Sequence, residues 1–163
     1  MVISAAGTIA NNSYRRFKMI SVGLDVSKGK STVCVLKPHG DIVCRPFEMQ
    51  HAKEDLEDFH NLLQKLDGEI RIVMEATGIY HLPVLTFLHD RGYFVSVVNL
   101  FAMKKYAKDN SIRRAKTDKL DSIMIANYGI EKWFRLQSYE GNEGTYAELK
   151  LLERSTSTKW KFM

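Results

Sequence analysis

The chain has 163 residues, enough for one domain with a packed core, and its 45% apolar content is typical of a folded protein rather than a disordered one. No apolar run approaches the roughly 20 residues that a membrane-spanning helix needs. Cys34 and Cys44, the only cysteines, lack the spacing of a zinc site. We therefore expect a cytoplasmic protein with no membrane association and no structural zinc.

The first 18 residues lack a basic start followed by a sustained apolar stretch, so they do not resemble a signal peptide. We expect residues 1–18 to be a loose extension, and Met19 to be the first residue that matters to the fold. Residues 20–26 then alternate apolar and polar side chains with the period of a β-strand.

Two more strand patterns follow at 31–37 and 41–49, after short turns, and together with the first they predict an antiparallel meander. Pro46 predicts that the third strand lies at a sheet edge or ends there, because proline cannot donate a hydrogen bond to a neighbouring strand. In the rest of the chain, segments whose apolar residues recur with the period of a helix alternate with segments patterned as strands. The remaining predicted elements are helix 51–68, strand 69–78, helix 79–92, strand 93–99, helix 100–110 and helix 116–130.

This order of elements predicts an α/β fold, a ribonuclease-H-like mixed five-stranded sheet flanked by helices. The sheet would combine the three-strand antiparallel meander with two parallel strands. In the last helix, Leu120, Ile123 and Met124 form an apolar stripe that is expected to pack on the rest of the domain. The fold class alone leaves the function open.

Four acidic residues stand where a metal site can form. Asp25 and Glu75 lie at the ends of the first and fourth predicted strands, and Asp118 and Asp121 are spaced to share one helix face. Each has an ordinary alternative role, in a turn, at a solvated strand end or at the start of a helix. Together they offer the oxygen ligands that Mg²⁺ prefers.

The positive charge of the chain is concentrated next to the last two acids. Seven basic and two acidic residues lie between positions 104 and 119, and seven minus two equals the whole chain's net charge of +5. Such a patch is typical of a surface that binds phosphate backbones, and the alternative is a solubilising face. Tyr106 either stacks on a base there or packs inside the domain. The expected phosphate-contacting residues are Lys104, Lys105, Lys108, Arg113, Arg114, Lys116 and Lys119.

Three segments, "GLDVSKGKSTVCVL", "VMEATGIY" and "AKTDKLDSIMIA", together resemble the amino-terminal catalytic domain of DEDD-type insertion-sequence transposases, which are related to the RuvC resolvase. The resemblance runs from about residue 19 to about residue 136. It implies a DNA recombinase in which Asp25, Glu75, Asp118 and Asp121 are catalytic and hold a two-ion Mg²⁺ site, with Mn²⁺ as a substitute. It also implies DNA as partner, a guide RNA in some members, and a homo-oligomer when full length.

Members of this family carry a second, carboxy-terminal domain that supplies a serine. Here residues 137–163 offer only a short linker or helix and the polar tail "RSTSTKWKFM", so we expect a truncated or frameshifted copy without that domain. Two other functions remain open. One is a non-catalytic nucleic-acid-binding remnant. The other is a fragment of an actin-like or sugar-kinase ATPase, because "GLDVSKGKSTV" is also similar to the phosphate-binding hairpin of those proteins.

Overall fold

A computed structural model of the chain describes residues 18–76, 78–110 and 117–141. The predicted extension, apart from residue 18, lies outside the described residues, as do residues 142–163 of the predicted tail. The basic residues Arg113, Arg114 and Lys116 also lie outside them. In the described part of the chain no helix is both long enough and apolar enough to cross a membrane.

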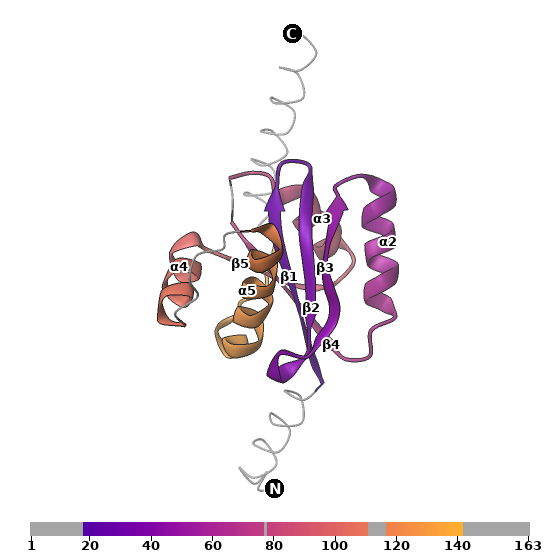
Figure 1. The fold of residues 1–163 in the computed structure, drawn as a ribbon. Coiled ribbons are helices and arrows are strands. Elements are labelled where there is room, and N and C mark those ends of the chain that lie inside the picture. Colours follow the sequence, from indigo (N-terminus) through magenta and orange to yellow (C-terminus); the bar gives the residue numbers. More distant parts are fainter. Residues whose placement is uncertain (1–17, 77, 111–116, 142–163) are drawn as a thin grey trace, which may run out of the picture.

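One mixed sheet forms the centre of the domain (Figure 1). Its strands lie in the order β3-β2-β1-β4-β5. β1 pairs antiparallel with β2 and parallel with β4, β2 pairs antiparallel with β3, and β4 pairs parallel with β5. This arrangement confirms the predicted sheet, and β3 is an edge strand as Pro46 indicated. The strands are β1 (Met19–Ser27), β2 (Lys30–Leu36), β3 (Ile42–Gln50), β4 (Glu69–Glu75) and β5 (Phe94–Val98).

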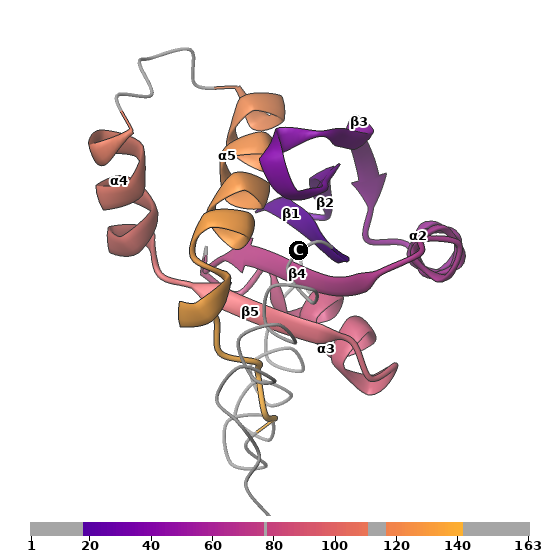
Figure 2. The same ribbon diagram turned by 90° about the horizontal axis from the view of Figure 1, so that it is seen from below.

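Helices cover both faces of this sheet. α2 and α3 pack on one face, and α4 and α5 lie side by side on the other (Figures 1 and 2). Each coincides with a segment that the apolar period predicted to be helical, and α5 extends one residue beyond its predicted end. The helices are α2 (Lys53–Gln64), α3 (Leu82–Asp90), α4 (Leu100–Asp109) and α5 (Asp118–Glu131), with short 3-10 turns at Pro38–Gly40 and Trp133–Arg135.

The alternation of β1 divides its side chains between these two helical layers. Ile20, Val22 and Leu24 are buried in the larger core, together with apolar residues of α2 and α3. Ser21 and Gly23 point to the opposite face, where Ser21 Oγ donates a hydrogen bond of 2.7 Å to the Ala126 carbonyl of α5. Because Asp25 continues this second series, its side chain is directed toward the α5 layer.

α5 packs only in part through the predicted apolar stripe. Leu120 is 45% exposed, and Ile123 and Met124 are only partly buried. The residues that α5 buries are Ser122, Ile125, Ala126, Gly129 and Ile130. Ile123 and Met124 pack against buried residues as predicted, whereas Leu120 does not, and small residues set how closely this helix approaches the sheet. A methyl group added at Gly23 would lie 2.5 Å from the Ala126 nitrogen.

His51, directly after β3, contacts the β1–β2 hairpin at two points. Its backbone nitrogen donates to the Gly29 carbonyl at 2.9 Å, and its Nε2 lies 2.7 Å from Ser31 Oγ. Burial lowers the pKa of His51 below its usual 6.5, because the charged imidazolium is poorly solvated there.

This pKa shift predicts a pH dependence of stability. Below 6.5 the unfolded chain takes up a proton on His51 before the folded chain does, so the free energy of unfolding falls as the pH is lowered. The contribution of neutral His51 to the free energy of unfolding is fully present above pH 6.5. We expect the His51→Gln variant to show a weaker fall in melting temperature across this acidic range than the wild type. Melting temperatures are measured by circular dichroism. If they fall equally with pH in the variant and the wild type, His51 is not the source of the pH dependence.

Candidate metal centre and nucleic-acid surface

Three of the four predicted acids meet at one end of the sheet. Asp25 lies near the end of β1, and Asp118 and Asp121 lie in the first turn of α5. Each offers a carboxylate oxygen, and these oxygens all lie within 4.8 Å of one another. Asp25 and Asp121 are half-buried and Asp118 is exposed. Folding therefore forms one group of carboxylates from segments that are far apart in the sequence.

Local structure fixes where α5 begins. Thr117 is its N-cap, and the Thr117 hydroxyl accepts a hydrogen bond of 3.2 Å from the Leu120 amide. Asp118 and Asp121 then fall one helical turn apart on the same side of the helix. The close contact between α5 and Gly23 lies two residues before Asp25 on β1. The same packing that buries Gly23 thus brings the first turn of α5 beside Asp25.

Glu75 lies on the neighbouring strand rather than in this three-carboxylate group. In the parallel register of β1 and β4, Gly23 pairs with Val73 and Leu24 with Met74, so Glu75 is the next position, alongside Asp25. Val73 packs with Ile125 of α5, and the two-residue period of a strand gives Glu75 the same direction. Glu75 is half-buried. The structure brings three predicted acids together and places the fourth on the adjacent strand.

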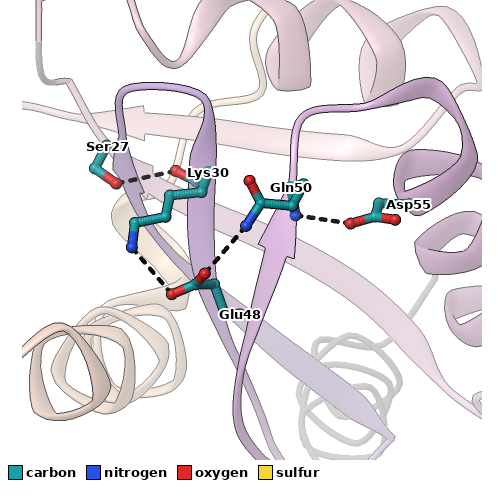
Figure 3. A network of polar contacts seen from close by, with 5 residues as sticks. All are labelled: Ser27, Lys30, Glu48, Gln50 and Asp55. Atoms are coloured by element: carbon teal, nitrogen blue, oxygen red, sulfur yellow. Dashed lines mark hydrogen bonds and ion pairs between the residues drawn. The ribbon is translucent and has the colours of Figure 1, made fainter.

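A network of polar contacts fixes the hairpin that follows Asp25 (Figure 3). Ser27 Oγ donates to the Lys30 carbonyl at 3.2 Å, and Lys30 Nζ forms an ion pair of 3.1 Å with Glu48 on β3. Gln50 donates through its side chain to Glu48 at 3.0 Å, and through its backbone to Asp55 of α2 at 3.0 Å. Lys30 is therefore engaged within the domain. These contacts tie the Asp25 end of β1 to β3 and α2.

Four of the predicted phosphate-contacting residues lie in the described part of the chain, three on α4 and one on α5. Lys104, Lys105 and Lys108 are exposed on α4, and Lys119 is exposed in the first turn of α5. Within the described residues none of these four forms an ion pair. Their ammonium groups are thus directed to solvent on the same side of the sheet as Asp118 and Asp121.

Tyr106 packs inside the domain, so the base-stacking alternative for this residue was wrong. It is 5% exposed, and its ring meets the Tyr128 ring edge-on at a centroid distance of 5.3 Å. Burial raises the pKa of Tyr106, and the charge of Glu131 and a hydrogen bond with Glu131 raise it further. The exposed aromatic residue of α4 is instead Phe101, which was not among the residues predicted from the sequence. Its helical spacing from Lys104, Lys105 and Lys108 was the available signal.

Comparison with known proteins identifies the family. Residues 22–160 match the family model of the IS110-type DEDD transposases. Pilin gene-inverting proteins of Moraxella bovis and Moraxella lacunata are each 27% identical to this chain over 111 residues, or 68% of its length. The chain spans about a third (34%) of the length of those relatives.

The fold also has a counterpart among solved structures. The structure of Thermus thermophilus RuvC superposes with a TM-score of 0.51 and 13% sequence identity, and the match covers 74% of this chain and 99% of RuvC. This similarity shows a shared fold, in agreement with the ribonuclease-H-like sheet predicted from the order of elements. By its match over most of its length, the chain belongs to the IS110-type DEDD transposase family.

Proposed function

We propose that this domain cleaves and recombines DNA strands with Mg²⁺ held by Asp25, Glu75, Asp118 and Asp121. The observation that carries the proposal is the group of three aspartate carboxylates whose oxygens lie within 4.8 Å of one another. The ATPase alternative is set aside, because the segment that suggested it begins at residue 23, inside the region that matches the transposase family.

The chemistry of these residues fits a divalent cation. Three negative charges held this close repel one another, and a bound cation relieves that repulsion. Mg²⁺ and Mn²⁺ both take carboxylate oxygens as ligands, and Mg²⁺ keeps several of its waters, so a few carboxylates are sufficient. Glu75, on the strand beside Asp25, is the fourth proposed ligand. When bound, such ions activate the attacking oxygen and stabilise the leaving oxygen of a phosphodiester displacement.

DNA is the proposed substrate for two reasons. Lys119 directly follows Asp118, and α4, which contacts α5, carries three more exposed lysines; lysines hold a nucleic acid by its phosphates without reading its sequence. The names of the Moraxella relatives describe the inversion of a gene, which is a rearrangement of DNA. The guide RNA, the homo-oligomer, the domain limits and the truncation that the resemblance suggested stay predictions.

Cleavage of a labelled branched DNA tests the proposal. We expect cleaved strands to accumulate when the protein is incubated with the DNA and Mg²⁺ or Mn²⁺, and no cleavage when EDTA removes the metal. DNA binding without cleavage in either metal would contradict the catalytic function, and would favour the non-catalytic nucleic-acid-binding alternative.

Binding to duplex DNA should weaken steeply with salt. Each phosphate that a lysine neutralises releases counterions and adds about 0.9 to the magnitude of the slope of log K against log salt concentration. We expect the triple substitution Lys104→Gln, Lys105→Gln and Lys108→Gln to reduce that magnitude by roughly 2 to 3. Fluorescence anisotropy of a labelled duplex over a range of salt concentrations measures it.

The matched control for this prediction is Lys65→Gln, which removes an exposed lysine at the end of α2, in the helical layer on the other face of the sheet. Its slope should equal that of the wild type. An affinity that stays flat with salt, or the same slope for the triple variant and the control, would show that α4 does not contact phosphates.

A further inference from the structure

The outer face of α4 combines one exposed aromatic ring with three lysines. Met103 and Tyr106 are the buried residues of this helix. Phe101, Lys104, Lys105 and Lys108 follow the spacing i, i+3, i+4 and i+7, which places them together on the side opposite the buried one. Phe101 is 83% exposed, the largest exposed fraction among the exposed large apolar residues of the described chain. The only acidic residue of α4, Asp109, lies outside this series.

The Phe101 ring also differs from other rings at the surface of the domain. Arginine guanidinium groups lie over the rings of Phe87, Phe94 and Phe134, at 3.5, 4.7 and 5.7 Å from the respective centroids. Within the described residues, Phe101 makes no such contact and no ring–ring contact. With 83% of the side chain exposed among the described residues, the ring is accessible to a planar group that approaches from solvent.

We propose that Phe101 stacks on an unpaired base of a nucleic-acid strand, while Lys104, Lys105 and Lys108 hold the phosphates on either side of that base. Surfaces that bind single strands combine aromatic rings with positive charge in this way, because every base has a face to stack and every nucleotide a phosphate. The proposal rests on the proposed function and specifies the form of its substrate: a strand with unpaired bases, bound on the helical layer that also carries Asp118 and Asp121.

Charge favours a nucleic acid over a protein partner on this face. Three lysines surround the ring and none has an acidic partner among the described residues. A polyanion neutralises all three lysines through its regularly spaced phosphates. Burying the Phe101 ring against an apolar protein surface would instead remove the lysine charges from water, which costs free energy. The location is compatible with this, because α4 contacts α5 through Tyr106 and Tyr128, so the Phe101 face belongs to the helical layer whose other helix carries Asp118 and Asp121.

Binding of a fluorescein-labelled single-stranded oligothymidine and of a matched duplex tests this proposal. We expect Phe101→Ala to weaken single-strand binding roughly tenfold, because one stacked base is lost. Duplex affinity should change little, because paired bases already stack on one another. The salt slope should equal that of the wild type, since no phosphate contact is removed. Phe101→Trp should restore single-strand affinity.

Phe134→Ala is the matched control, because it removes another exposed ring, one that an arginine covers. It should bind both DNAs as the wild type does. Equal single-strand affinity for Phe101→Ala and the wild type would overturn the stacking role. If the triple lysine variant then still loses salt-dependent affinity, the proposed DNA surface stands without the ring. If the wild type binds neither DNA, this inference and the proposed function both fail.

Discussion

Asparagine at position 25 is expected to reduce Mg²⁺-dependent DNA cleavage by roughly a thousandfold or more, since a lost metal ligand removes several kcal/mol of transition-state stabilisation. Asparagine keeps the size of the side chain but removes its charge. DNA binding in EDTA should stay close to that of the wild type, because the lysines of α4 and α5 are unchanged. Single-turnover cleavage rates and fluorescence anisotropy measure the two effects separately.

Asp67→Asn serves as the control, because Asp67 is an exposed acid between α2 and β4, outside the carboxylate group. It should cleave at the wild-type rate. Circular dichroism establishes that both variants are folded. Equal cleavage rates for Asp25→Asn and the wild type would contradict the catalytic role of Asp25.

Alanine at position 23 is expected to lower the free energy of unfolding by about 3 kcal/mol, at the upper end of the usual cost of overpacking a core. The added methyl group would lie 2.5 Å from the Ala126 nitrogen and 2.9 Å from its Cα, and would also collide with the Ser122 carbonyl oxygen. All three atoms belong to the α5 backbone, which cannot give way as a flexible side chain does. Urea unfolding of the wild type and the variant measures the loss.

The same substitution should weaken metal binding, because moving α5 outward carries Asp118 and Asp121 away from Asp25. The control is Gly92→Asn, at a position after α3 where an added side chain meets open space and φ is +79°, a conformation that asparagine tolerates. Its stability should change little. Wild-type stability in Gly23→Ala would mean that α5 does not lie on β1 as the structure describes.

Much of the fold could be predicted from the period of apolar residues. The alternation in β1, the edge position that Pro46 indicated for the third strand, and the helical stripes of the middle segments all agree with the structure. The packing of α5 could not be predicted in that way. Apolar patterning favours large side chains such as Leu120, whereas the helix approaches β1 through Gly23, Ala126 and Gly129. Which small residues meet is decided by the tertiary fold.

The candidate site was predictable to a similar extent. Asp118 and Asp121 were expected on one helix face from their spacing alone, and their carboxylates lie together with that of Asp25. Nothing in the spacing indicated that Glu75 would lie beside this group rather than within it, because that depends on the β1–β4 register. Phe101 was missed because exposure, rather than residue type, distinguishes it from Tyr106.

The most direct test of the metal centre is a crystal structure of the protein soaked with Mn²⁺, in which anomalous scattering locates the ion. We predict a Mn²⁺ peak bonded to carboxylate oxygens of Asp25, Asp118 and Asp121. A fully occupied peak elsewhere, with no ion among these three carboxylates, would contradict the central claim that folding brings them together to bind a divalent cation.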